Sequence, residues 1–197
     1  TPLYSSAASD VYKRQTVTNV DTGTRPIAVP SSSIIGLCDT FTPGPAASAL
    51  PNQLLLITRE SEAIAAWGAD AAITKAIKAI YVRSKAVIVA CGVEKLADAA
   101  AQTSAIIGGV LANGTRTGMQ ALLDGKSRFN AQPRLLAAPK HTATLPAATA
   151  LVALSEKLRA LAIIDGPNTT DEAAMEYREN FGSKRVFLVD PGVQYWD

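Results

Sequence analysis

An α/β fold with a mostly parallel sheet is predicted by the stretch from Pro133 to Pro191, where three short apolar runs alternate with two helical patterns. The runs, each ending in Pro or Gly, are RLLAAP (134–139), LAIIDGP (161–167) and RVFLVDPG (185–192). Two sets of side chains recur at helical spacing between them: Leu151, Leu154, Leu158 and Leu161, then Ala174, Tyr177, Arg178 and Phe181. Runs too apolar to alternate between two faces are typical of parallel strands buried on both sides. Helices are therefore expected to flank the sheet.

The part of the chain ahead of this stretch carries weaker strand signals. The segment from Pro26 to Asp39 contains β-branched residues but is interrupted by Pro30, which lacks a backbone donor and predicts an edge strand or a bulge. Segment 42–52 holds three prolines and one glycine and is predicted to be a loop. The run QLLLIT (53–58) then predicts a buried strand.

Helices and one more strand follow this run. Thr58 or Ser61 can cap a helix that Gly68 ends. A second helix is predicted by apolar residues that share one face: Ile73, Ala76, Ile77 and Ile80. The run AVIVACG (86–92) predicts a central strand, and an Ala-rich helix is expected from about Lys95 to Ile107.

Loops and helix starts complete the pattern. Segment 108–118 contains four glycines and is predicted to be a loop or a frayed helix end; the spacing of these glycines fits neither phosphate-binding fingerprint. A short helix is expected over Met119, Leu122 and Leu123. Thr144 ahead of Pro146 marks the start of the next helix, and Thr169 with Glu172 forms a predicted capping box for the last one. Five or six strands should therefore alternate with five or six helices.

The sequence divides into three expected parts. Residues 1–15 lack an initiator Met and any periodicity, and SSAASDVYKRQ (5–15) resembles translated sequencing-adapter read-through, so this leader is excluded from the fold. Residues 16–26 are polar and β-prone without an amphipathic face, which predicts an extended arm with a turn at 21–23. Residues 27–197 are expected to form the α/β domain. Its end at VQYWD, directly after a predicted strand, indicates that a C-terminal domain is missing.

Composition limits the possible partners. The chain of 197 residues is 48% hydrophobic and 18% charged, with a net charge of +2. Lys and Arg do not cluster along it, so neither nucleic acid nor an anionic membrane is indicated. No apolar stretch approaches the roughly 20 residues that span a bilayer, and no signal-peptide pattern precedes the fold. Cys38 and Cys91 each lie near the end of an apolar run and are expected to be reduced, buried thiols of a cytosolic protein.

The histidine at position 141 is a weak candidate for chemistry. A Cys–His pair with either thiol would be a conceivable nucleophilic site, but no orienting partner is visible for His141. The favoured interpretation is a solvent-facing loop side chain. One histidine and two scattered cysteines also exclude a zinc site of ordinary ligand spacing.

Asp165 and Asp190 are stronger candidates because each follows a predicted parallel strand. Ligands bind at the carboxyl ends of such strands, where two carboxylates could hold Mg²⁺ or act as acid and base. The alternative is that Asp-Gly-Pro (165–167) and Asp-Pro-Gly (190–192) are ordinary turns, and this interpretation is favoured. We therefore expect no catalytic residue, no cofactor and no metal ligand.

Several strings in this chain resemble the first part of the sheath proteins of contractile tails from temperate myophages. The resemblance covers roughly residue 20 to the end, in the same order throughout. Its most specific strings are PRLLAAP (133–139), KLRALAIID (157–165) and YRENFGSKRVFLVDP (177–191). Less specific ones are GTRPI (23–27), SSSIIGLCD (31–39), NQLLLIT (52–58), TSAIIGG (103–109) and TGMQALLDG (117–125).

The resemblance implies a structural subunit with no active site, in a virion tail assembled in a bacterial cytoplasm. Its implied partners are other sheath subunits in stacked hexameric rings, the tail tube protein, the baseplate and the tail terminator. Such a sheath contracts when the baseplate triggers and drives the tube through the target envelope. A tailocin or a type VI secretion apparatus would share the fold.

The resemblance also implies that the N-terminal arm adds a strand to a neighbouring subunit, with Val17, Val20 and Asp21 in that arm. Without the native start of the arm and the C-terminal domain, the fragment should not polymerise alone. A cytosolic α/β enzyme that binds a small ligand near Asp165 and Asp190 is the alternative. Such an enzyme should gather several polar side chains around one pocket at the strand ends.

Overall fold

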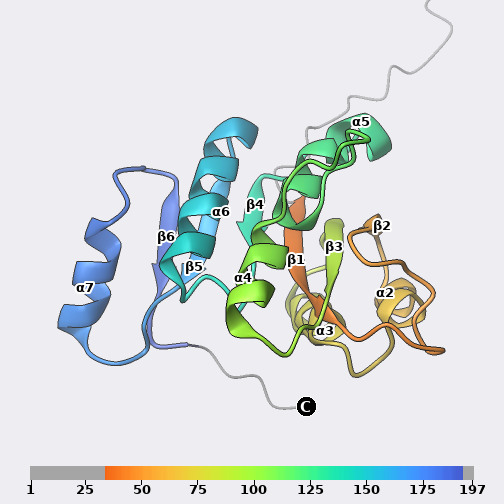
Figure 1. Cartoon of the computed structure of the whole chain (residues 1–197). Coiled ribbons are helices and arrows are strands. Elements are labelled where there is room, and N and C mark those ends of the chain that lie inside the picture. The colour runs from red at the N-terminus through yellow and green to blue at the C-terminus, as the bar shows by residue number, and fades with distance from the viewer. Residues whose placement is uncertain (1–33, 193–197) are drawn as a thin grey trace, which may run out of the picture. The chain divides into compact units, whose positions relative to one another are not determined.

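The computed structural model of the protein describes residues 34–192, and a six-stranded sheet organises them. Its strands are β1 Ile35–Phe41, β2 Leu54–Ile57, β3 Ile88–Glu94, β4 Leu135–Ala137, β5 Leu161–Asp165 and β6 Val186–Val189. They lie in the order β2-β3-β1-β4-β5-β6. β2 runs antiparallel to β3, and every other neighbouring pair is parallel. The predicted α/β class and mostly parallel sheet are confirmed (Figure 1).

Helices flank both faces of the sheet. The α-helices are α2 Glu60–Trp67, α3 Ala72–Arg83, α4 Ala99–Ile107, α5 Gly125–Phe129, α6 Leu145–Leu158 and α7 Asp171–Glu179, and a 3-10 helix η1 spans Gly118–Asp124. Figure 1 shows α4 and α6 on the near side of the sheet, α3 on the far side, and α7 at the outer end beyond β6.

One apolar cluster forms on each face. Leu37 of β1 and Ala90 of β3 pack with α2 and α3 on one side. Cys38 of β1 and Cys91 of β3 pack with α4, η1 and α6 on the other. Successive residues of a strand point to opposite faces, so β1 and β3 supply side chains to both clusters. Both thiols are free and fully buried, as predicted.

An edge strand or a bulge was predicted for the first strand, and the edge position was wrong. β1 lies in the middle of the sheet, where Ile35 pairs with Ile88 of β3 and with Leu135 of β4. The strand begins at Ile35, five residues after Pro30, so the ladder needs no donor from the proline, which lies outside the described residues. A proline near a strand therefore excludes a central position only where it falls inside the hydrogen-bonded ladder.

Helix starts show three shifts from expectation. α2 is preceded by Arg59 as its N-cap, and not by Thr58 or Ser61. Thr144 precedes α6 and a proline occupies its first turn, as predicted. α7 is capped by Thr170, whose hydroxyl accepts from the Ala173 N–H at 3.2 Å, and not by Thr169. α4 begins only at Ala99, because Asp98 caps it by accepting from the backbone N–H of Ala101 at 2.7 Å.

Glu62 gives the start of α2 a pH-dependent stabilisation. Its carboxylate accepts from the backbone N–H of Thr58 at 2.7 Å and of Arg59 at 3.2 Å. The Thr58 bond is the main cause that lowers the pKa of Glu62 from its ordinary 4.5. A lowered folded-state pKa means that the stabilisation is present above pH 4.5 and is lost as the pH falls through the folded-state pKa.

We therefore expect Glu62→Gln to lower the free energy of unfolding at pH 7 by about 0.3–0.5 kcal/mol, since solvent screens this carboxylate. At pH 3 this difference should be smaller, because the carboxylate is then protonated to a larger extent. Thermal melts at both pH values measure this, with Glu60→Gln in the same helical turn as the matched control. A constant difference at the two pH values would contradict the assignment.

Candidate functional site

Four candidate side chains lie near the carboxyl ends of the parallel strands. Asp39 lies near the end of β1, and His141 follows β4, its neighbour in the sheet. The His141 Nε2 atom is 3.1 Å from Asp39 Oδ1, and the two side chains keep only 19% and 6% of their exposure. The prediction of a solvent-facing loop histidine was wrong, because the strand order brings a carboxylate of distant sequence against it.

No thiol contacts this histidine, so the Cys–His hypothesis gains no support. Cys38 lies directly opposite Cys91 in the register of β1 and β3. A hydrogen bond with Cys91, followed by burial, raises the pKa of the Cys38 thiol well above its ordinary value. A raised pKa lowers the fraction of thiolate, which is the reactive form. The pair therefore behaves as core.

Asp165 stabilises the loop after β4. Its Oδ2 atom accepts from the backbone N–H of Lys140 at 2.7 Å and from the hydroxyl of Thr142 at 3.1 Å. The same hydroxyl accepts from the Asp165 N–H at 2.9 Å. Tyr177 donates to the carbonyl of Thr142 at 2.6 Å, and burial, with a smaller effect of Asp165, raises the pKa of this phenol.

Asp190 has a similar role after β6. Its Oδ2 atom accepts from the backbone N–H of Asn168 at 2.8 Å, and the Asn168 side chain accepts from the N–H of Gly192 at 3.0 Å. Both carboxylates thus bind backbone groups, as the turn interpretation expects. Within residues 34–192, no three His, Cys, Asp or Glu side chains come together in a way that could hold a metal ion.

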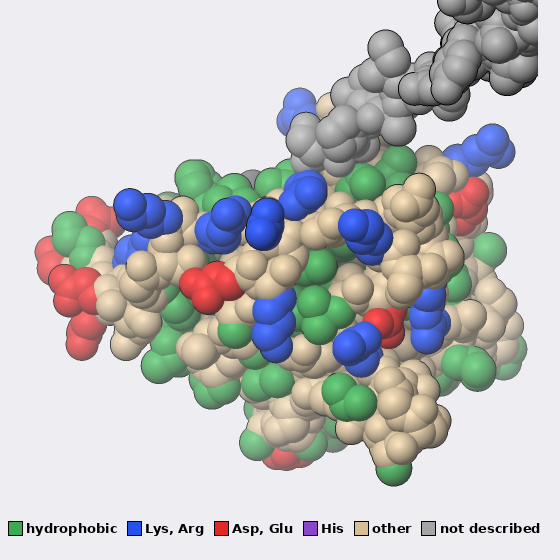
Figure 2. Space-filling view, turned by 90° about the horizontal axis from the view of Figure 1, so that it is seen from above, with side chains coloured by type: hydrophobic (Ala, Val, Ile, Leu, Met, Phe, Trp, Pro, Cys, Tyr) green, Lys and Arg blue, Asp and Glu red, His purple; other side chains and the backbone are tan. Residues whose placement is uncertain are grey.

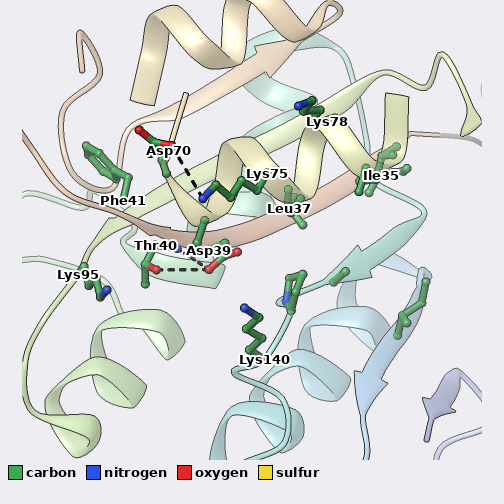
Figure 3. Close-up of a pocket in the computed structure, with 18 of the residues that line it drawn as sticks. Ile35, Leu37, Asp39, Thr40, Phe41, Asp70, Lys75, Lys78, Lys95 and Lys140 are labelled. Carbon is green, nitrogen blue, oxygen red and sulfur yellow. Dashed lines mark hydrogen bonds and ion pairs between the residues drawn. The ribbon is translucent and has the colours of Figure 1, made fainter. Parts of the chain in front are cut away.

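A hollow lies on one face of the sheet. It encloses about 720 Å³ between α3 and the face formed by β1, β4 and β5, with an apolar floor that includes Leu37, Leu135 and Ile163. Lys95 and Lys140 lie at its border, and Lys75 pairs with Asp70 at 3.9 Å on the α3 side (Figure 3).

The hollow exists because α2 and α3 cover only part of this face. They pack on the β2-β3-β1 side, whereas Ile163 stays half-buried and Phe187 of β6 is 57% exposed. Asp165 and Asp190 do not line the hollow. Asp39 and Thr40 of β1 do line it, and the Thr40 hydroxyl donates to Asp39 Oδ1 at 3.5 Å. The rest of its floor offers apolar contact area.

Sequence reasoning missed Asp39 as the partner of His141. A signal was present, since Asp39 ends the apolar run IIGLCD just as Asp165 ends LAIID. Because that run was expected at the edge of the sheet, Asp39 was not considered together with the residues at the ends of the other strands. The arm residues Val17, Val20 and Asp21 lie outside the described residues. None of the described helices has both the length and the apolar character needed to cross a bilayer.

Taken together, these features define an α/β domain whose strand-end carboxylates hydrogen-bond to neighbouring loops and whose sheet has one partly uncovered apolar face. Sequence comparisons relate it to sheath proteins. It is 64% identical over 182 residues to the "Putative prophage major tail sheath protein" of Pseudomonas aeruginosa (strain UCBPP-PA14), covering 92% of this chain and 47% of that protein. It is 32% identical to the tail sheath protein of Escherichia phage P2, covering 96% and 49%. No family model matches.

The fold has a counterpart among solved structures. A chain of the cryo-EM structure of the anti-feeding prophage (AFP) baseplate in the contracted state superposes with a TM-score of 0.54 over 87% of this chain and 45% of its own, at 11% identity. The chain is thus a homologue of contractile-tail sheath proteins, and the predicted resemblance is confirmed. It spans about half the length of the curated relatives it matches.

Proposed function

We propose that this chain is part of a structural subunit of a contractile tail sheath, which surrounds a tail tube and contracts to drive it through the envelope of a target cell. The observation that carries the proposal is the 64% identity to a prophage tail sheath relative over 92% of the chain. Two phage tail sheath proteins match at 32% and 31% identity.

The contacts at the strand ends support a role without catalysis. His141 is engaged by Asp39, and Asp165 and Asp190 are engaged by backbone N–H groups, so these polar groups hold loops in place. In the proposed sheath, the partners are further copies of the subunit, the tail tube, the baseplate and the tail terminator. Its place is the virion tail, assembled in the host cytoplasm.

Electron microscopy of the complete gene product, expressed alone in bacteria, tests this function. Long hollow tubes with regular striations are expected. A monodisperse protein without tubes would overturn the proposal and favour the alternative of an enzyme. Thermal-shift screening with Mg²⁺ and nucleotides would then test for a ligand near Asp165 and Asp190.

The expected N-terminal arm, residues 16–26, allows a second test of the proposed function. Strand addition uses main-chain hydrogen bonds, so it depends on backbone N–H groups more than on side chains. We expect the double variant Val17→Pro/Val20→Pro to lose tubes almost completely, as should deletion of residues 16–25, because proline removes the donors. Val17→Thr/Val20→Thr keeps the donors and the β-propensity and should still form tubes. Equal assembly of both double variants would contradict a strand-forming arm.

A further inference from the structure

Basic side chains gather at the amino ends of the parallel strands. We define the basic edge as Lys85, Arg128, Arg134, Lys157, Arg159, Lys184 and Arg185. These residues precede β3, β4, β5 or β6, and parallel strands begin at one edge of a sheet. All are exposed except the half-buried Arg134. Figure 2 shows a row of Lys and Arg side chains across this end of the molecule. The expectation that Lys and Arg do not cluster was therefore wrong in space, although it holds along the sequence.

The basic edge has few acidic neighbours of its own. None of its side chains takes part in an ion pair within residues 34–192. Arg134 donates to the carbonyl of Leu158 at 3.2 Å, which neutralises no charge. Glu156 in the last turn of α6 is the nearest acid in sequence. Positive charges this close together repel one another, and a negatively charged partner surface would relieve that repulsion.

The acidic counterpart is on α7. Glu172, Met175, Glu176 and Glu179 are exposed and recur at the i, i+3, i+4 and i+7 spacing that places them on one helix face. Met175 is 64% exposed, and no α7 side chain is buried. Arg178 turns away and donates to the carbonyl of Phe181. In Figure 2, acidic side chains gather at the α7 end of the molecule.

We propose that the acidic face of α7 in one subunit docks on the basic edge of a second copy of this chain. The inference rests on the proposed function, because it names surfaces through which sheath subunits would meet. Glu172 and Glu179 are seven residues apart, about 10 Å along a helix. From β4 to β6, where Arg134 and Arg185 lie, two strand spacings also give about 10 Å. Each carboxylate can therefore meet a cation.

The topology of such a contact suits a growing assembly. The two patches are different surfaces of one molecule, so the contact is head-to-tail and leaves a free patch on each partner. Head-to-tail contacts generate rings or helical stacks, whereas a contact between identical patches stops at a dimer. Nucleic acid could explain the basic edge alone, but it leaves the acidic face of α7 and exposed Met175 without a role.

Charge reversal in the complete gene product tests the contact. The α7 reversal is Glu172→Lys/Glu176→Lys/Glu179→Lys, and the edge reversal is Lys157→Glu/Arg159→Glu/Arg185→Glu. Each alone should lower the sedimentable, tube-assembled fraction at least about tenfold, and combining them in one chain should restore assembly. The control Glu60→Lys/Asp70→Lys/Glu94→Lys makes the same charge change as the α7 reversal, but elsewhere on the surface, and should assemble normally. Circular dichroism verifies that every variant is folded.

Wild-type assembly by both reversals, or no rescue in the combined variant, would overturn the proposal. So would loss of DNA binding in the edge reversal alongside normal assembly of the α7 reversal, which would assign the edge to nucleic acid. The variant Glu176→Cys/Arg159→Cys separates this inference from the proposed function. It should give an intermolecular disulfide ladder under mild oxidation even if no tubes form, and a ladder no stronger than in Glu60→Cys/Arg159→Cys would overturn the contact.

Discussion

Replacing Gly108 with alanine is expected to destabilise the fold by about 3–5 kcal/mol. Gly108 ends α4 with φ of 67° and ψ of −169°, a region that residues with a Cβ rarely adopt. A Cβ there would overlap the backbone carbonyl of Thr117 and approach the Cα of Gly118 at 2.8 Å. Backbone atoms cannot swing aside as a side chain can. Thermal unfolding of the domain should show a Tm lowered by about 6–15 °C.

Gly109→Ala is the matched control in the same loop. A Cβ at Gly109 would meet nothing within 4 Å, and its backbone bonds to Thr117 would remain. This variant should change the free energy of unfolding by less than about 0.5 kcal/mol. Similar losses for the two alanine variants would contradict the conformational explanation for Gly108.

The second large effect is expected for Thr142→Val, at about 2–4 kcal/mol. Valine fills nearly the same volume but lacks the hydroxyl, which in the fully buried Thr142 donates to Asp165 Oδ2 and accepts from the Asp165 N–H. Removing it leaves the part-buried Asp165 N–H and the Asp165 carboxylate oxygen without this partner, at about 1–3 kcal/mol for each group. Urea unfolding measures the change, which should appear in the midpoint with the slope unchanged.

Thr144→Val provides the comparison, since its hydroxyl donates to the carbonyl of His141 at 2.8 Å but lies exposed. Water can replace this hydrogen bond, so the expected loss is below about 1 kcal/mol. If Thr142→Val were as mild as Thr144→Val, the hydroxyl of Thr142 would not stabilise the loop that carries His141.

The elements of this fold were largely predictable because they depend on local signals. Apolar runs ended by Pro or Gly located β4, β5 and β6, and helical spacing located α3, α6 and α7. The order of strands was not predictable in the same way. Pro30 pointed to an edge, but β1 is central, because its ladder is fixed by partners 53 and 100 residues away at Ile88 and Leu135. The long loop 42–52 likewise left the antiparallel direction of β2 open.

The functional surfaces were less predictable because they form from distant residues. His141 and Asp39 are 102 positions apart, and no local pattern joins them. The basic edge could have been foreseen. Once parallel strands are predicted, the basic residues ahead of them, Arg134, Arg159 and Arg185, must share one edge. The arm residues Val17, Val20 and Asp21 remain predictions.

β1 and β3 contribute side chains to both apolar clusters, so the two clusters are expected to unfold together. Leu37 and Ala90 belong to one cluster, and their chain neighbours Cys38 and Cys91 to the other. Loss of either cluster would displace β1 and β3, and the other cluster needs both strands in place. Scanning calorimetry of the domain should therefore record a single endotherm whose calorimetric and van't Hoff enthalpies agree. A mechanical force applied to one face of the sheet would therefore be opposed by the apolar contacts on both faces.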